Sequence, residues 1–211
     1  MTLGAAAAGI SQLAGEITES QASRLSEYVR LARKLGSRWN LMSPAALAGI
    51  EEHLIDSAAL LRVHDPECGS LADLGSGGGL PGVVLAILRP RWRVTLVDSR
   101  RSKVVFLREA ASMLDLGNAE VVHGRIEELQ KGAFDTAVSR ALGPVRKTLG
   151  PSLKTVRRGG KLILYKGPSW EEERAEAAEV AGEWGAAIAA EERVKLPGLS
   201  RATTFVTFEL E

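Results

Sequence analysis

The chain has 211 residues, of which 45% are hydrophobic and 25% charged, a size and composition typical of one globular domain with room for a short appendage. Its formal net charge of +1 provides no overall attraction to nucleic acid, so any RNA-binding surface has to come from local clusters of lysine and arginine. A single cysteine, Cys68, excludes an internal disulfide framework, and with only three histidines we expect no metal cluster.

The N-terminal third is predicted to be helical. Apolar residues recur at helical spacing from Ser20 to Leu35 and again from Ala45 to Leu61. The alanine-rich start lacks the basic flank of a signal peptide, and no apolar run reaches the roughly 18 residues of a membrane span, so we expect a cytoplasmic protein. We divide the chain into a helical extension, residues 1–66, and a main domain, residues 67–211.

Beyond Ser70, short apolar runs alternate with longer mixed segments, a texture that predicts a parallel α/β sheet covered by helices on both faces. The expected strands are Leu71–Leu74, Val94–Val97, Glu120–His123, Thr136–Ser139 and Leu162–Tyr165, and the expected helices are Leu80–Leu88, Ser102–Leu114, Pro144–Val156 and Ser169–Trp184. A turn at 196–200 predicts that Arg193–Leu196 and Thr203–Leu210 close the sheet as a hairpin.

The segment Leu71–Gly82 places a strand, a glycine cluster and a helix start in direct succession. Glycines allow the backbone to turn sharply and to approach a ligand closely, and the free N–H groups of the following helix attract negative charge. The segment therefore predicts a nucleotide-like ligand at the carboxyl end of the first strand.

Two cofactors fit this glycine cluster. The spacing from Gly77 to Gly82 satisfies the dinucleotide fingerprint, whereas Asp73 followed by alternating glycines fits the pattern of S-adenosylmethionine-dependent methyltransferases. The second interpretation is favoured because S-adenosylmethionine has no diphosphate, for which Asp73 would be an unfavourable neighbour. A dinucleotide-dependent oxidoreductase remains the alternative.

Asp98 ends the second predicted strand, about 20 residues beyond the glycines, where a carboxylate can accept both ribose hydroxyls of either cofactor. It can also cap the helix that follows, together with Ser99. The two roles are compatible.

In their order and spacing these motifs resemble the RsmG (GidB) family, which methylates guanine N7 in small-subunit (16S) ribosomal RNA. The resemblance covers roughly residues 25 to 167 and is carried by Asp73–Gly82, Leu96–Ser99, Lys103, Phe106–Leu107, Ser139–Ala141 and Tyr165–Gly167, with Trp39–Leu41 and His53–Ser57 in the extension. It implies a Rossmann-like class I methyltransferase with a mostly parallel seven-stranded sheet. Two departures are a triple glycine where the family often has Gly-Pro-Gly, and a shorter segment between Asn40 and His53.

The resemblance also implies a set of cofactor contacts. These are Gly75 and Leu80 in the glycine loop, Ile126 and Glu127 after the third strand, and Arg140 after the fourth. The glycine pattern and the strand end add Gly77 and Asp98 to the expected contacts. The expected cofactor is S-adenosyl-L-methionine.

Guanine N7 carries a lone pair and no proton, so methyl transfer to it needs alignment more than a general base. We expect Arg140 and Lys166, after the fourth and fifth strands, to position the base or an RNA phosphate. For Arg140 the alternative is a surface ion pair with an acid such as Glu127, and for Lys166 a solvated lysine. His53 and Asp56 lie one helical turn apart and can form a hydrogen-bonded pair.

Trp39 is predicted to be a core anchor in preference to a stacking surface.

Three basic clusters are candidates for phosphate contacts, although such runs are usually solvated helix faces. The clusters are Arg30, Arg33, Lys34 and Arg38; Arg100, Arg101, Lys103 and Arg108; and Arg146, Lys147, Lys154, Arg157, Arg158 and Lys161. We expect a monomer that binds ribosomal RNA, free or in the particle; a small-molecule methyltransferase or a non-catalytic cofactor-binding protein remain possible.

Overall fold

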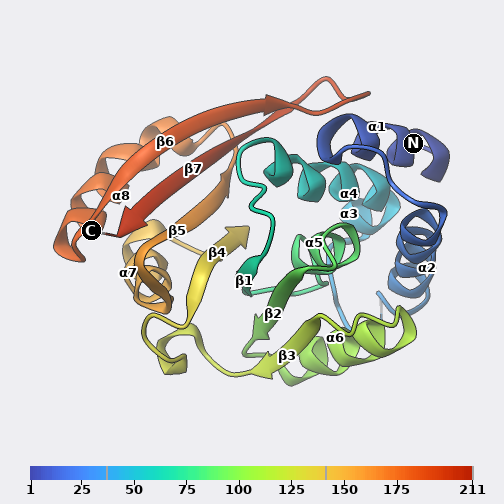
Figure 1. Cartoon of the computed structure of the whole chain (residues 1–211), viewed down its shortest axis with the longest axis horizontal. Helices are drawn as coiled ribbons and strands as arrows, with labels where there is room; N and C mark the ends of the chain where they lie inside the picture. The colour runs from blue at the N-terminus through green and yellow to red at the C-terminus, as the bar shows by residue number, and fades with distance from the viewer. Residues whose placement is uncertain (37, 141, 211) are drawn as a thin grey trace.

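The computed structural model describes residues 1–36, 38–140 and 142–210 and contains one seven-stranded sheet. The strand order is β3-β2-β1-β4-β5-β7-β6, with β1 to β5 parallel and β7 antiparallel to both of its neighbours (Figure 1). The strands are β1 Gly69–Leu74, β2 Trp92–Asp98, β3 Ala119–His123, β4 Phe134–Arg140, β5 Val156–Lys166, β6 Ala186–Lys195 and β7 Ala202–Leu210. The seven-stranded α/β fold predicted from the sequence is confirmed, including its closing hairpin.

The helices follow the expected alternation, with differences at the N-terminus. They are α1 Leu3–Ala14, α2 Glu19–Leu35, α3 Pro44–Ala48, α4 Ile50–Ala58, α5 Gly82–Leu88, α6 Arg101–Met113, α7 Val145–Thr155 and α8 Trp170–Glu183, with short 3-10 turns η1 Ala59–Arg62 and η2 Ile126–Glu128. The single helix predicted from Ala45 to Leu61 is wrong: Gly49 separates α3 from α4, and η1 ends the segment. Helix α1 lies in the extension predicted to be helical, although no individual helix was assigned there, and β6 starts seven residues before the expected Arg193.

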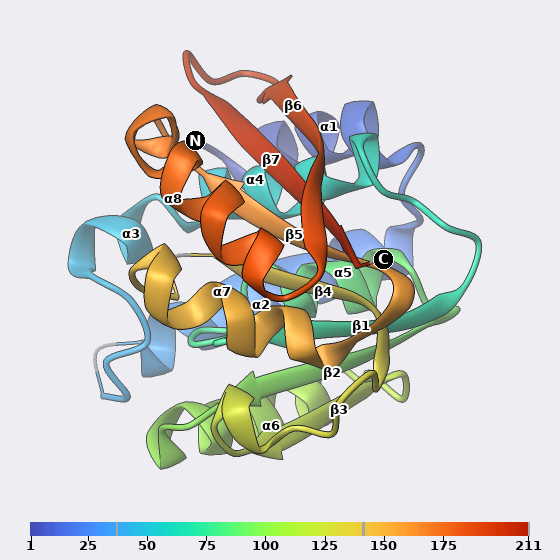
Figure 2. The same ribbon diagram turned by 90° about the vertical axis from the view of Figure 1, so that its left-hand side faces the viewer.

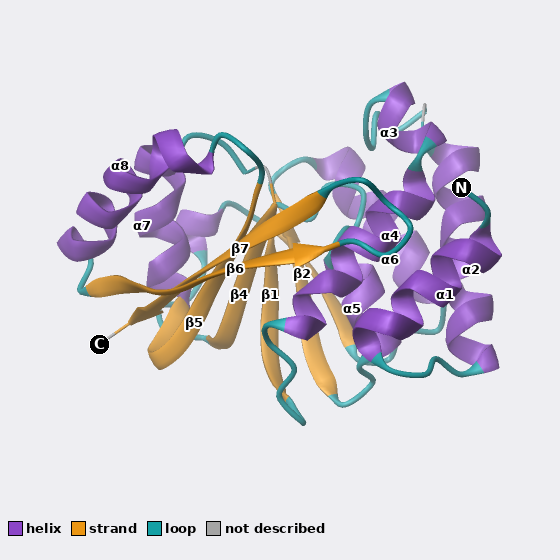
Figure 3. Ribbon diagram, turned by 90° about the horizontal axis from the view of Figure 1, so that it is seen from above, coloured by secondary structure: helices purple, strands orange, loops and turns teal. Residues whose placement is uncertain are grey.

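The sheet separates two hydrophobic layers, one on each face (Figure 3). Side chains alternate along β1, so that Leu71 faces the layer of α1, α2, α4, α5 and α6, whereas Ala72 and Leu74 face α7 and α8. Figure 2 shows α7 and α8 side by side on their face of the sheet. Both faces are thus covered, which explains why β1, β2, β4 and β5 each contain a run of consecutive buried residues.

The N-terminal helices pack directly on the sheet domain. One hydrophobic cluster contains Ile10, Leu25 and Leu54 from the extension together with Leu85 and Phe106 from α5 and α6. The buried Tyr28 hydroxyl donates a 2.6 Å hydrogen bond to the carbonyl of Gly78 in the glycine loop. The extension therefore supports the loop that follows β1, while a boundary at residue 66 stays a prediction. Among the described residues, no helix is both long and apolar enough to cross a membrane.

Candidate active site

The glycine loop after β1 is a sharp turn in which the backbone folds back toward β2. The N–H groups of Gly75 and Ser76 both donate to the carbonyl of Val97, at 2.9 Å each. Gly75 has φ of +77°, and a Cβ at this position would clash with the Leu142 side chain. Glycine is therefore favoured here by its backbone conformation, because a positive φ is strained for other residues, whereas the methyl end of Leu142 can move aside.

Asp73 braces this loop from the inside. Its side chain is fully buried, and Oδ2 accepts a 2.9 Å hydrogen bond from the backbone N–H of Gly82, the first residue of α5. Burial raises the pKa of the Asp73 carboxyl to about 6. A Cβ on Gly82 would clash with Leu96 and lie 2.7 Å from Asp73 Oδ2, so this glycine lets α5 pack closely on the sheet.

Asp98 joins the glycine loop to the turn after β2. Its Oδ2 accepts a 2.9 Å hydrogen bond from Gly77 N–H, and its Oδ1 accepts a 2.8 Å hydrogen bond from Arg100 N–H. The N-cap of α6 is Arg100 itself, so Asp98 braces the approach to that helix without being its cap residue. A carboxylate has about four lone-pair positions, and two remain available for hydroxyl donors.

A cavity of about 280 Å³ lies beside Asp98. Four of the expected cofactor contacts, Gly75, Asp98, Ile126 and Glu127, line it together. Gly77 does not line this cavity but holds Asp98 through its N–H, and Leu80 is buried in the hydrophobic core. The cavity combines the backbone of Gly75, the carboxylates of Asp98 and Glu127, and the apolar side chain of Ile126. Such a combination suits a nucleoside, so the residues present fit S-adenosylmethionine.

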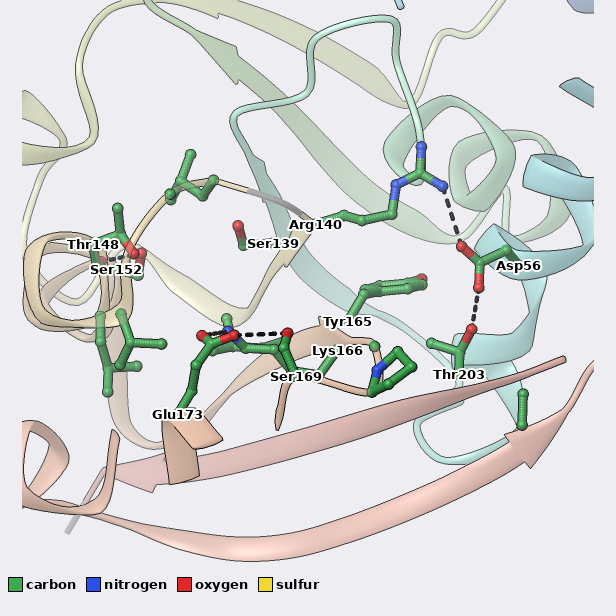
Figure 4. Close-up of a pocket in the computed structure, with 18 of the residues that line it drawn as sticks. Asp56, Ser139, Arg140, Thr148, Ser152, Tyr165, Lys166, Ser169, Glu173 and Thr203 are labelled. Carbon is green, nitrogen blue, oxygen red and sulfur yellow. Dashed lines mark hydrogen bonds and ion pairs between the residues drawn. The ribbon is translucent and has the colours of Figure 1, made fainter. Parts of the chain in front are cut away.

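A second, larger cavity of about 630 Å³ opens at the carboxyl ends of β4 and β5 (Figure 4). It contains Arg140 and Lys166, the two residues expected to position the substrate. Leu142 and Thr148 line both cavities, so the two adjoin at this point. Ala141, the last residue of the Ser139–Ala141 motif, lies outside the described residues.

Arg140 is held by an acid from the helical extension. Its Nη1 lies 3.2 Å from Oδ2 of Asp56 in α4, and the Thr203 hydroxyl of β7 donates to the other oxygen of Asp56. Asp56 takes the place that the sequence interpretation gave to an acid such as Glu127 as the ion-pair partner. The arrangement brings together residues from β4, the extension and the C-terminal hairpin (Figure 4).

The structure shows no hydrogen bond between His53 and Asp56; the two Asp56 oxygens accept from Arg140 and Thr203 instead. Nδ1 of His53 is buried and has no hydrogen-bond partner among the described residues. Burial, followed by the charge of Arg140, lowers the pKa of His53, so the imidazole is neutral at pH 7. His53 is thus a neutral neighbour of the Arg140–Asp56 pair and not its hydrogen-bond partner.

Lys166 is also fixed by the protein. Its Nζ donates to Glu173 Oε2 at 2.7 Å and lies 5.6 Å from the centre of the Trp170 ring. The hydroxyl of Ser169 donates to the other carboxylate oxygen of Glu173 at 3.1 Å. Glu173 and Ser169 were not identified from the sequence, because the acidic run at 171–173 reads as an ordinary solvated helix start.

Several of the remaining candidates have structural partners. Trp39 packs against the core cluster of the extension, as its predicted anchor role requires. Lys103 is buried and donates to the carbonyl of Asn40, so the second basic cluster loses this residue as a phosphate contact. Arg33 pairs with Glu51. In the third cluster, Arg146 pairs with Glu176 and Glu179, and Arg157 with Asp135.

Comparison with known proteins gives a consistent result. A family model described as rRNA small subunit methyltransferase G (GidB) matches residues 21–188. A ribosomal RNA small subunit methyltransferase G of Burkholderia pseudomallei (strain 1106a) is 35% identical over 96% of this chain and 89% of its own length. A ribosomal RNA small subunit methyltransferase G of Nitrosospira multiformis is 37% identical over 81% of this chain and 82% of its own length.

The fold has relatives among solved structures as well. The crystal structure of M. jannaschii TYW2 in complex with AdoMet aligns with a TM-score of 0.59, covering 81% of this chain and 78% of that one. At 14% sequence identity, this likeness concerns the fold alone.

Proposed function

Because this chain belongs to the rRNA small subunit methyltransferase G family, we propose that it transfers the methyl group of S-adenosylmethionine to N7 of a guanine in small-subunit ribosomal RNA. The observation that carries this proposal is the pair of adjoining cavities. The cavity beside Asp98 suits a nucleoside, and the cavity beside Arg140 is lined by polar and cationic groups that suit a nucleobase.

Asp98, Gly75, Ile126 and Glu127 would hold the cofactor, which supplies a methyl group on a positively charged sulfur. The carboxylate of Asp98 would accept the ribose hydroxyls, while its two backbone hydrogen bonds keep it oriented. The glycine loop keeps side chains away from the amino-acid end of the ligand. These residues bind and orient, and none of them has to move a proton.

The acceptor side needs alignment of the N7 lone pair with the methyl carbon, not a general base. Arg140, fixed by Asp56, would orient the base by stacking or hydrogen bonding. Lys166 lies in the same cavity and would add a hydrogen-bond donor. A precise hold on the base matters because small misplacements of a reacting group can cost about 100-fold in rate.

The decisive experiment is incubation of the protein with labelled S-adenosylmethionine and unmodified small-subunit particles, followed by digestion and nucleoside analysis. Labelled 7-methylguanosine supports the proposal, and any other methylated nucleoside refutes it. Repeating the incubation with naked ribosomal RNA distinguishes free RNA from the assembled particle as the substrate. Titration with NAD tests the oxidoreductase alternative, for which the family assignment gives no support.

Exposed cations near the cofactor cavity, such as Arg100 and Arg125, would contact RNA phosphates. We propose that the protein acts in the cytoplasm and as a monomer. Binding to the RNA should weaken steeply between about 50 and 200 mM salt because counterions are released. A flat response to salt would contradict phosphate contacts. Sedimentation of the isolated protein tests the monomeric state.

A further inference from the structure

Lys166, Ser169 and Glu173 form a fixed polar group on the wall of the larger cavity, at the end of β5 and the first turn of α8 (Figure 4). Lys166 Nζ and Ser169 Oγ each donate to a different oxygen of the Glu173 carboxylate, at 2.7 and 3.1 Å. The carboxylate is thereby held from both sides and cannot rotate freely.

This group differs from an ordinary surface ion pair because it is partly shielded from solvent and keeps free hydrogen-bonding positions. The side chain of Lys166 is only 13% exposed and that of Glu173 31%, whereas fully exposed pairs have little fixed geometry. The hydrogen bond from Lys166 lowers the pKa of Glu173, so the carboxylate is charged at neutral pH. Each oxygen of Glu173 keeps a lone pair, and Lys166 keeps donors beyond the one that it gives to Glu173.

The free lone pairs of the two Glu173 oxygens are adjacent acceptors, and the free N–H groups of Lys166 lie next to them as donors. The Watson–Crick edge of guanine has the complementary order: the N1–H and 2-amino groups donate, and O6 accepts. Adenine has an acceptor at N1, which would face the carboxylate lone pairs. N7 lies on the neighbouring Hoogsteen edge, next to O6, and stays free when the Watson–Crick edge is bound.

Building on the proposed function, we propose that Glu173 and Lys166 determine specificity for guanine by binding its Watson–Crick edge. Glu173 accepts hydrogen bonds from N1–H and the 2-amino group, and Lys166 donates to O6. The other carboxylate of the cavity, Asp56, is less suited to this role because its side chain is only 8% exposed, against 31% for Glu173, and because two cations, Arg140 and Arg201, lie against it. Ser169 holds the carboxylate of Glu173 in position.

The test compares ribosomal RNA in which splinted ligation places guanosine, inosine or adenosine at the nucleotide that the enzyme methylates. Inosine lacks only the 2-amino group, so it removes one hydrogen bond to a charged acceptor. Such a bond contributes about 1.5–3 kcal/mol, and the wild-type protein should therefore methylate inosine about 10- to 150-fold less efficiently in kcat/KM. Adenosine should give no detectable product.

Glu173→Gln should lower kcat/KM for guanosine about 10- to 100-fold and bring the guanosine-to-inosine ratio to within about threefold, because an amide cannot accept both donors. Glu173→Asp keeps the charge and should keep the preference for guanosine at a lower rate. Glu172→Gln is the matched control: it removes the same charge from an exposed neighbouring residue and should change neither the rate nor the ratio. Binding of S-adenosylhomocysteine and the melting temperature check that each variant is folded.

Equal methylation of guanosine and inosine by the wild type would overturn the inference, and so would an unchanged ratio in Glu173→Gln. If Glu173→Gln does not fold, the guanosine-to-inosine ratio of the wild type and of Glu173→Asp still tests the inference. Loss of the preference for guanosine in Glu173→Asp would contradict it. A wild type that makes no 7-methylguanosine would instead refute the proposed function. The two failures are thus distinguishable.

Discussion

Asp73 is a buried carboxyl whose ionisation should oppose folding, and Asp73→Asn tests this directly. Asparagine keeps an oxygen that can accept the 2.9 Å hydrogen bond from Gly82 N–H but carries no titratable proton. Burial raises the pKa of Asp73 from 3.8 to about 6, so the native state holds the proton more tightly than the unfolded chain. The stability contributed by the protonated carboxyl is complete below pH 3.8 and is lost as the pH rises through 6.

The magnitude follows from the linkage of protons to folding. At about 1.4 kcal/mol per pH unit, the unfolding free energy of the wild type relative to Asp73→Asn should fall by about 2.4 kcal/mol between pH 4 and pH 7. Urea unfolding of both proteins across this range measures the difference. A difference that stays constant with pH would refute the view that Asp73 is a desolvated charge at neutral pH.

Asp135→Asn provides a control of opposite sign. Hydrogen bonds from Ser70 N–H, and then from Arg157, lower the pKa of Asp135 to about 2. Its stabilisation should be present above pH 3.8 and should be lost as the pH falls toward 2, which is the reverse of the trend for Asp73. The effect should be small because the side chain is 37% exposed and its charge is screened by solvent.

Three further variants test the packing and the two cavities. Gly82→Ala should lower the unfolding free energy by about 1–3 kcal/mol in a thermal or urea melt, because the added Cβ clashes with the sheet, whereas Gly182→Ala has open space in α8 and should cause no loss. Asp98→Ala should weaken binding of S-adenosylhomocysteine by calorimetry at least about 10-fold, and unchanged affinity would contradict its role in the cofactor cavity. Asp56→Asn should reduce kcat about 10- to 100-fold with little change in cofactor affinity, because it releases Arg140; a fall in cofactor affinity alone would argue against a positioning role.

Local sequence patterns were sufficient to predict the architecture of the sheet domain and the residues at the strand ends that line the two cavities. Each strand and helix of the sheet domain carries its own periodicity, and the glycine loop and Asp98 lie at strand ends whose position follows from that periodicity. The carboxyl ends of parallel strands meet at one edge, so Asp98, Arg140 and Lys166 could be assigned to the same side of the sheet. These features depend on residues close in sequence.

Only the tertiary structure decided which side chains hold one another. Arg140 and Asp56 are 84 positions apart and Thr203 and Asp56 are 147 apart, so no local spacing could indicate that they meet. Lys103 lies among exposed basic residues in the sequence, yet the packing of α6 against the extension buries it beside Asn40. Periodicity within one element predicts the face that it buries, whereas the partner of a charged group depends on how distant elements are placed in space.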